Sequence, residues 1–397
     1  MSPSTTVSLR ACNDYNRGEV EQAVRAAIED LDGIDRFIKK DQKVLIKPNL
    51  LAPRAVSKVV TTHPEIVRAI MRVVADTGAK MYLGDSPAIG SAVTAARKGE
   101  LTDIADHFNA EVVNFTEACR ADKVETCKYQ FLELAREALE ADAIVNLPKV
   151  KTHGAQTLTL GVKNLFGCVV GRAKMQWHLK AGSSSVDFAR MLVDIYATLK
   201  PVLTVADGVM GMEGNGPGSG TPRKLGWIAA ASDAVAMDRV ITDVLGVPTD
   251  RVFMLEAAKQ AGVGETDISR IEIRGLSIKE AQSLSDADRR PFELPPDPRT
   301  SGGLMPFLER VMKNSLTPEP LVDHGMCTRC GTCSEACPPQ VIKLEQMKAK
   351  DKAGHDTKVE INRKGCIHCY CCQELCPEGA ITIKTGWLAG LIAKSSA

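Results

Sequence analysis

Two cysteine-rich stretches near the end of the chain decide the fold of that region. Residues 327–338 read CTRCGTCSEACP, and residues 366–377 read CIHCYCCQELCP. Both follow the spacing C-x2-C-x2-C-x3-C-P, in which three cysteines on a curled loop bind three corners of one iron–sulfur cubane. The fourth cysteine of each stretch is carried away on the following turn and binds the other cluster. The repeated spacing therefore predicts a small α+β, ferredoxin-like domain that holds two [4Fe–4S] clusters.

The same spacing predicts which cysteines bind which cluster. The first cluster is predicted to use Cys327, Cys330, Cys333 and Cys376, and the second to use Cys366, Cys369, Cys372 and Cys337. Cys371 fits no ligand position, so it is predicted to be a neighbouring non-ligand. Structural zinc is the alternative, because zinc also binds paired cysteines, but a zinc site does not require this four-cysteine pattern twice.

Length and composition limit the remaining classes of protein. The 397 residues suit two domains, and 44% apolar with 25% charged residues is usual for a globular protein. The formal net charge of +1 gives no reason to expect binding to nucleic acid. No stretch approaches the roughly 20 apolar residues of a membrane-spanning helix, and residues 1–10 have no signal-peptide core. Thirteen cysteines without an export signal favour metal binding in a reducing compartment, so we expect a cytoplasmic protein.

The longer, N-terminal part of the chain alternates between short strand patterns and amphipathic helices. Strands are expected at residues 43–47, 80–84, 111–115, 143–147, 202–206 and 225–229. Helices are expected at residues 20–31, 64–77 and 233–245. Strands separated by helices indicate an α/β domain, in which a mostly parallel sheet carries helices on both faces.

Changes in composition suggest four segments. We expect the α/β domain at residues 1–288, a proline-rich linker at 289–321 with a short helix at 305–314, and the cluster domain at 322–385. A short tail, residues 386–397, follows. Its apolar residues Trp387, Leu388, Leu391 and Ile392 suit a helical face that docks on the body of the protein or, alternatively, contacts a membrane surface or a partner.

Polar residues gather where the predicted strands of the α/β domain end. Because ligands of open α/β sheets bind beyond the carboxyl ends of the strands, we expect one substrate site built from several loops. The predicted substrate-binding residues are Lys47, Asn49, Asp85, Lys149 and Lys151, and the predicted catalytic residues are His153, Lys163 and Asp207. The lysines suit a carboxylate or phosphate, whereas the aspartates suit a metal, proton transfer or capping of a turn.

Other features of this domain leave alternatives open. For His63 and His178 a structural and a functional role both stay open, and the glycine-rich residues 211–220 suit a flexible lid. These glycines lack the Gly-Lys-Ser/Thr ending of a P-loop, and no Gly-x-Gly-x-x-Gly after a strand supports a nicotinamide dinucleotide.

The order of these strand-end motifs, together with the second cysteine stretch, resembles the Domain of Unknown Function 362 family. Members of that family commonly end in a ferredoxin module, and the resemblance covers nearly the whole chain. A fainter resemblance links His153, Lys163 and His178 to nickel-pincer lactate racemases. In those enzymes a lysine tethers the cofactor, and histidines supply metal ligation and acid–base chemistry.

The sequence therefore predicts an iron–sulfur reductase. Electrons from a soluble donor (a ferredoxin, flavodoxin or reductase) pass through the clusters to a small, anionic substrate in the α/β domain. One alternative is a non-catalytic electron carrier or maturation protein that acts on a partner. Another is a metal-cofactor enzyme distantly similar to the nickel-pincer racemases.

Overall fold

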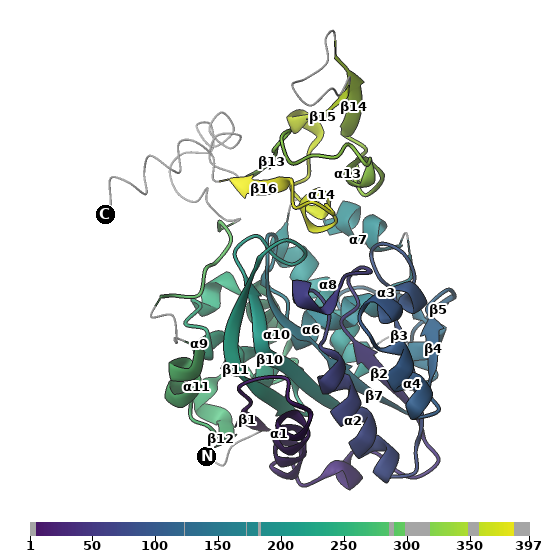
Figure 1. The fold of residues 1–397 in the computed structure, drawn as a ribbon, viewed down its shortest axis with the longest axis vertical. Coiled ribbons are helices and arrows are strands. Elements are labelled where there is room, and N and C mark those ends of the chain that lie inside the picture. Colours follow the sequence, from purple (N-terminus) through teal and green to yellow (C-terminus); the bar gives the residue numbers. More distant parts are fainter. Residues whose placement is uncertain are drawn as a thin grey trace.

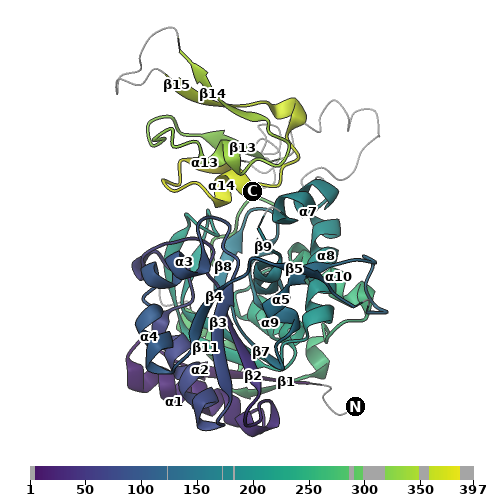
Figure 2. The same cartoon turned by 90° about the vertical axis from the view of Figure 1, so that its right-hand side faces the viewer.

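The structure, a computed structural model, describes residues 5–122, 124–171, 173–181, 184–285, 290–297, 318–347 and 357–384. A large α/β domain carries a smaller module on one end (Figure 1). In the side view, helices α13 and α14 of the module face the large domain, and the β14–β15 hairpin points away from it (Figure 2). The expected helix at 305–314 and the tail at 386–397 lie outside the described residues.

The large domain is built on a ten-stranded sheet with the order β12-β1-β11-β10-β7-β2-β3-β4, and β8 and β9 extend it beside β10. Pairs of neighbouring strands from β10 through β7, β2 and β3 to β4 are parallel, whereas β11 is antiparallel to both β1 and β10. The strands are β1 Thr5–Ala11, β2 Lys43–Pro48, β3 Lys80–Asp85, β4 Glu111–Asn114, β7 Ala143–Leu147, β8 Lys149–His153, β9 Thr157–Leu158, β10 Leu203–Glu213, β11 Thr221–Ala231 and β12 Ile271–Gly275. A separate hairpin pairs β5 Ala118–Arg120 with β6 Glu133–Ala135.

Helices cover both faces of the sheet, and each face has its own apolar core. One core contains residues of α1 Arg17–Glu29, α2 Pro64–Asp76, α3 Ala92–Lys98 and α4 Thr102–His107. The other contains residues of α5 Arg136–Leu139, α6 Gly161–Asn164, α7 Ala173–Ala181, α8 Ser185–Leu199, α9 Ala234–Val244, α10 Phe253–Ala261 and α11 Ile278–Ser285. Short 3-10 helices are η1 Ile34–Arg36, η2 Val56–Lys58, η3 Leu165–Cys168, η4 Thr249–Arg251 and η5 Ile268–Arg270. The predicted α/β class with a mostly parallel sheet is confirmed.

Local sequence explains where several helices begin. Asn16 accepts a hydrogen bond from the N–H of Gly18 at the start of α1. His63 caps α2 through Nδ1, and Pro64 occupies the first turn, where its missing N–H is not needed. Asp233 caps α9 by accepting from two backbone N–H groups. Each of these helices starts within a few residues of its predicted position.

Two strands differ from expectation at the edge where the site was predicted. The strand expected at 202–206 continues as β10 to Glu213, because it pairs with β11 along its whole length. Residues 149–153, expected as a polar segment after a strand, form β8, which pairs with β10 in parallel and with β9 in antiparallel. Predicted loop residues such as Asp207 and Lys149 are therefore held rigidly within the sheet.

The small module is α+β. Strand β13 Glu319–Val322 pairs with β16 Ile381–Lys384, and β14 Ile342–Gln346 pairs with β15 Thr357–Ile361. Its helices are α13 Thr332–Glu335, the 3-10 helix η6 Arg363–Gly365 and α14 Cys371–Glu374. Within the described ranges of the whole chain, every helix is too short or too polar to traverse a bilayer.

Candidate functional site

Two small cavities in the module are each lined by four cysteines. One is lined by Cys327, Cys330, Cys333 and Cys376. The other is lined by Cys337, Cys366, Cys369 and Cys372. In each set, three cysteines come from one stretch and the fourth comes from the other stretch. The fold therefore brings together the same groups of cysteines that the spacing predicts, and the ligand assignment itself stays a prediction.

The chemistry of both cavities fits an iron–sulfur cubane. Their walls are largely apolar, with Val322 and Val359 beside the first set of thiols and Ile342 and Ile367 beside the second. Burial raises the pKa of Cys333 to about 11, so its thiolate needs a bound metal to form at neutral pH. Among the described residues, no three His, Cys, Asp or Glu side chains are grouped as ligands of a single metal ion. The thiols surround cavities instead, as ligands of separate corners of a cluster must.

The two cysteine loops repeat one geometry. Arg329 and Gly331 have φ values of 58° and 81°, and His368 and Tyr370, at the matching positions of the second loop, have 52° and 58°. These left-handed residues curl each loop around its cavity. In this alignment of the loops, Cys371 matches Thr332, the first residue of α13, and Glu374 matches Glu335.

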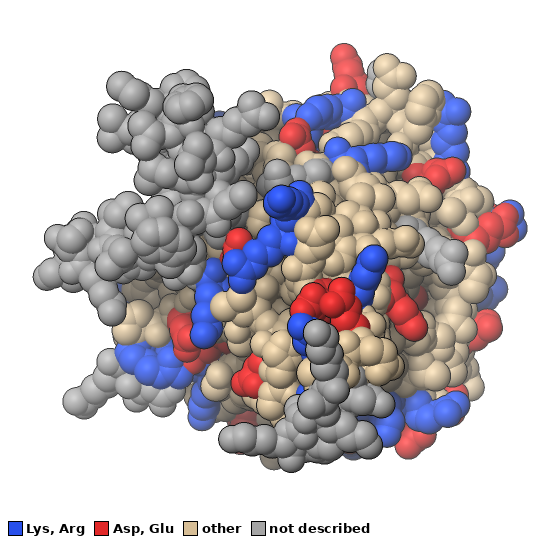
Figure 3. Space-filling view, turned by 90° about the horizontal axis from the view of Figure 1, so that it is seen from above, with Lys and Arg blue, Asp and Glu red and all other residues tan. Residues whose placement is uncertain are grey.

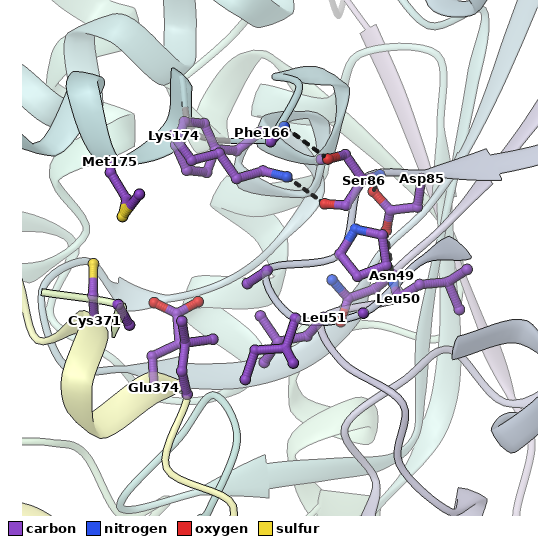
Figure 4. A pocket seen from close by; sticks show the side chains of 18 of the residues that line it. Asn49, Leu50, Leu51, Asp85, Ser86, Phe166, Lys174, Met175, Cys371 and Glu374 are labelled. Carbon is purple, nitrogen blue, oxygen red and sulfur yellow. Dashed lines mark hydrogen bonds between the residues drawn. The ribbon is translucent and has the colours of Figure 1, made fainter. Parts of the chain in front are cut away.

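A third and much larger cavity, of about 490 Å³, lies between the module and the α/β domain (Figure 4). Loops after β2 and β3, helix α6 and helix α7 line it from the α/β domain. Helices α13 and α14 line it from the module and contribute Thr332, Glu335, Cys371 and Glu374. The Cys371 sulfur points toward Met175 of α7 across this cavity, not into a cysteine-lined cavity (Figure 4).

Lys47 and Asp85 form a buried ion pair at the ends of β2 and β3, with Nζ 2.9 Å from Oδ1. The other Asp85 oxygen accepts a hydrogen bond from the N–H of Leu50 at 2.7 Å. Asp85 lines the large cavity, whereas Lys47 lies behind it. The pair therefore holds two strand-end loops together at the cavity, and the charge of Asp85 is neutralised by Lys47.

A chain of buried amides and lysines supports the same wall. Lys151 Nζ donates to Asn49 Oδ1 and to Val60 O, both at 2.6 Å, and Asn49 Nδ2 donates to Asn164 Oδ1 at 3.1 Å. Burial lowers the pKa of Lys151 to about 7. Asn49 lines the large cavity and also an adjoining cavity of about 30 Å³, which Lys149 and Lys151 line as well.

Lys163 lines both the large and the adjoining cavity. Lys163 belongs to the short helix α6. The Asp238 carboxyl stabilises the start of this helix by accepting hydrogen bonds from the N–H of Gly161 at 2.7 Å and the N–H of Val162 at 3.0 Å. Among the described residues, Lys163 Nζ has no hydrogen-bond or ion-pair partner, and its nearest ring is Phe166, with the centroid 5.8 Å away. Burial lowers the pKa of Lys163, and the charge of Glu374 opposes this shift.

His178 of α7 also lines the large cavity. It is 9% exposed, stacks on Phe188 and meets the edge of Phe166, but its ring nitrogens have no hydrogen-bond partner among the described residues. Burial lowers the pKa of His178 to about 3, so the imidazole is neutral at physiological pH. Close by, Lys174 donates a hydrogen bond to the carbonyl oxygen of Ser86.

His153 joins the two parts of the protein. Its Nδ1 accepts hydrogen bonds from the N–H groups of Ala155 and Gln156, so the proton of the neutral ring is on Nε2. Nε2 lies 3.4 Å from an oxygen of Glu374 in α14. Burial lowers the pKa of His153 to about 4, and the neutral ring therefore holds Glu374 by a contact across the domain boundary.

Asp207 belongs to a separate buried network. Lys149 Nζ lies 2.8 Å from Asp207 Oδ2, and the Tyr15 hydroxyl donates to Oδ1 at 2.8 Å. The N–H of His63 donates to Oδ2 at 2.9 Å, and the His63 ring stacks on Tyr15. Every Asp207 oxygen is thus engaged, and Asp207 lines neither cavity described above.

The glycine-rich loop between β10 and β11 docks the module. Gln373 Nε2 donates to the carbonyl oxygens of Asn215 and Gly216, at 2.9 and 3.0 Å. Gly218 packs so closely on α14 that an added Cβ would lie 2.5 Å from the carbonyl oxygen of Glu374. Arg54 adds hydrogen bonds to the carbonyl oxygens of Cys376 and Pro377. The expectation of a flexible lid is therefore corrected: the glycines permit close backbone packing between domains.

The structure distributes the residues predicted for the substrate site over three places. Asn49, Asp85 and Lys163 line the large cavity. Lys149 and Lys151 line the adjoining cavity. Neither cavity is lined by the remaining three residues, which are Lys47, His153 and Asp207. Sequence reasoning missed Lys174 and Glu374. The one available signal for Glu374 was its match to Glu335 in the other cysteine stretch, and both line the large cavity.

Comparison with known proteins identifies the same two parts of the chain, the α/β domain and the module. Residues 44–243 match the domain of unknown function DUF362, and residues 326–380 match a 4Fe–4S dicluster domain. The chain therefore belongs to the DUF362 family, and its C-terminal module is an iron–sulfur domain of the kind that transfers electrons. A thylakoid-associated protein from Synechocystis sp. is 38% identical over 261 residues, which cover 66% of this chain and 81% of that protein.

Among solved structures, the lactate racemase apoprotein from Thermoanaerobacterium thermosaccharolyticum is similar at a TM-score of 0.37 and 12% identity. The match covers 58% of this chain and 55% of that chain, so it spans about half of each. A likeness this distant carries no argument about function. The hypothesis that Lys163 tethers a cofactor stays a prediction from sequence.

Proposed function

We propose that this protein is an iron–sulfur oxidoreductase that reduces a small anionic molecule in the cavity between its two parts. The observation that carries the proposal is the composition of that cavity. Strand-end loops of the α/β domain form one wall, and α14 forms the other, with Cys371 directly before the predicted cluster ligand Cys372. A molecule bound there is close to a cluster-binding loop, and the wall around it has both polar and apolar side chains.

The proposed cofactors are two [4Fe–4S] clusters, bound by the two sets of four cysteines described above. When bound, they would supply electrons one at a time. The fold supports this assignment because each set surrounds its own apolar cavity in the module.

In this proposal Lys163 binds the anionic group of the substrate. An ammonium group without a protein partner, at the wall of a concave site, attracts an anion more strongly than a fully exposed surface lysine does. His178 adds a neutral hydrogen-bonding group, and Lys174 adds a second ammonium beside Ser86. Together they orient the substrate against the wall formed by α14.

The other predicted site residues take positioning roles. His153 holds Glu374 at the cavity, Lys47 fixes Asp85, and Lys151 fixes Asn49. Lys149 and Asp207 neutralise each other beneath the sheet edge. We therefore propose Lys163 as the residue of the predicted catalytic set that touches substrate, with His153 and Asp207 acting through other residues.

The test uses anaerobic holoprotein whose clusters have been reduced, with excess reductant removed. Small organic acids with reducible bonds are added, and reoxidation is followed by the return of visible absorption. Lys163→Ala should slow reoxidation by the best acid at least tenfold without changing iron content. Lys180→Ala is the matched control, because Lys180 is on α7 but lies over Trp177, outside the large cavity. Equal loss in both variants would contradict the role of Lys163.

A second candidate is an electron carrier for a partner protein. It is favoured by the loop before the first cysteine stretch, where Met326 is 54% exposed beside Cys327 and the exposed Cys330. Asp323 fixes this loop by accepting from the N–H groups of Gly325 and Met326. The face of the protein seen from above carries basic and acidic side chains interspersed, so no single sign of charge dominates it (Figure 3). Reoxidation by a partner protein but by no small acid would favour the carrier.

A cytoplasmic location remains the prediction from sequence. The relative from Synechocystis is named as thylakoid-associated. Fractionation of cells into soluble and membrane parts tests whether this chain shares that association.

A further inference from the structure

The polar groups of the large cavity divide into those already bonded to the protein and those that are not. Asp85 is paired with Lys47, and Asn49 is bonded on both sides of its amide. Lys174 donates to Ser86. Within the described part of the chain, the groups that have no bond to the protein are the Lys163 side-chain nitrogen, the His178 imidazole and the Glu374 oxygen that does not face His153. Lys174 uses one of its three N–H donors on Ser86 and keeps the others for a ligand.

A protonated Lys163 and an ionised Glu374 carry opposite charges, and both line the same two cavities, yet their side chains do not form an ion pair within 4 Å. Lys163 belongs to the α6 turn of the α/β domain, whose first N–H donates to Asp238. Glu374 belongs to α14 of the module, and one of its oxygens lies 3.4 Å from Nε2 of His153. Both side chains line a cavity of about 490 Å³, so one ligand in that cavity can contact both.

We infer that the cavity binds a compact organic acid that carries a hydrogen-bond donor beside its carboxylate. The carboxylate lies against Lys163, and the donor, a hydroxyl or an amine, lies against Glu374. The inference rests on the proposed function, since it assigns the chemical class of the substrate to the same cavity.

The negative charge of Glu374 disfavours a phosphate ester, which is the main rival. A phosphate ester would bring about two negative charges next to the Glu374 carboxylate, and like charges at close range repel. The glycine-rich loop, which in other proteins cradles phosphates, is here occupied by contacts with Gln373. A cavity of about 490 Å³ has room for a small acid, and the neutral His178 at its wall adds no positive charge.

Calorimetric titration of oxidised holoprotein tests the inference without any turnover. Glycolate and glycine carry both groups, acetate carries only the carboxylate, and ethanolamine carries only the donors. We expect glycolate or glycine to bind at least tenfold more tightly than acetate, and ethanolamine to bind weakest. The better of the two tells whether the donor is a hydroxyl or an amine. Equal binding of acetate, or no binding of any compound, would overturn the inference.

Variants identify the two contacts. Lys163→Met should weaken glycolate and acetate alike by at least tenfold, because both use the carboxylate. Glu374→Gln should reduce the preference for glycolate or glycine over acetate to less than threefold, while acetate binds as before. Lys180→Met, outside the cavity, should change neither. Iron content and melting temperature of each variant show whether it is folded.

This experiment separates the inference from the proposed function. Holoprotein that is reoxidised by small acids but does not prefer an acid with a neighbouring donor retains the proposed function and loses the inference. Holoprotein that binds glycolate or glycine with the expected dependence on Lys163 and Glu374, but is never reoxidised by a small acid, loses the proposed function alone.

Discussion

Replacement of Asp207 by Asn distinguishes a catalytic carboxylate from a structural one. The Asp207 carboxylate is fully buried and contacts Lys149, the Tyr15 hydroxyl and the N–H of His63. Asparagine has nearly the same shape but no charge, so it leaves Lys149 without a counter-charge inside the protein. The expected result is a large loss of stability with full iron content.

The magnitude follows from the burial of the pair. Lys149 and Asp207 side chains are 2% and 0% exposed, and removing one partner of a buried pair costs about 3–5 kcal/mol. For a domain of this size, each kcal/mol lowers the melting temperature by about 2–4 °C, so a fall of about 6–20 °C is expected. Lys149→Met should cost a similar amount. The double variant should lose less stability than the two single variants lose together, because it leaves no buried charge without a partner.

The assay is anaerobic denaturant unfolding followed by tryptophan fluorescence, with iron measured on the same samples. Asp76→Asn is the matched control, since it breaks the Arg25–Asp76 pair, whose side chains are 42% and 51% exposed. Such exposed pairs contribute about 0–1 kcal/mol, so this variant should be nearly as stable as the wild type. If Asp207→Asn instead unfolds like the wild type but cannot be reoxidised by substrate, the structural role is wrong and Asp207 is catalytic.

Four further outcomes are expected. Anaerobic protein should hold about eight irons per chain, and Cys337→Ser should damage the cluster of the second cysteine stretch; spectroscopic loss of the first-stretch cluster alone would contradict the cross-ligation. Cys371→Ser should leave the iron content at the wild-type level, because Cys371 lines the large cavity and neither cysteine-lined one. Gly218→Ala should force the loop away from α14 and make Cys371 more reactive to an alkylating reagent, as mapped by mass spectrometry, whereas unchanged labelling would argue against the close contact. Burial raises the pKa of Asp238 to about 8, whereas an aspartate in an unfolded chain has a pKa near 4. The contribution of the protonated carboxyl to the stability of the fold is therefore complete at low pH and is lost as the pH rises through about 8. The stability of the wild type relative to Asp238→Asn should accordingly fall between about pH 4 and pH 8 and stay level above that range.

The sequence by itself determined the iron–sulfur module and the family. Cluster ligation depends on thiol groups at short, fixed spacing along one chain, and such spacing is visible without a fold. The α/β class was equally accessible, because each buried strand of a parallel sheet is a short apolar run and each helix repeats its apolar residues at its own period. Strands such as β2 and β7 were therefore found within a residue of their observed bounds.

Boundaries that depend on pairing partners were not accessible. Nothing within residues 207–213 shows that they continue a strand, because the cause is their pairing with β11. Likewise, the glycines at 214–220 suit either a mobile lid or close packing, and only the approach of α14 to Gly218 decides between them.

The composition of the candidate site was decided by tertiary structure. Charged residues at strand ends look alike in a sequence, yet Lys149 is neutralised by Asp207, whereas Lys163 has no partner among the described residues. Glu374 lies more than two hundred residues from Lys163 and inside a motif that already has another purpose. Its place at the cavity follows from the docking of α14 through Gln373 and His153. Whether a charge is available to a ligand depends on which groups surround it in space, and only the folded chain brings those groups together.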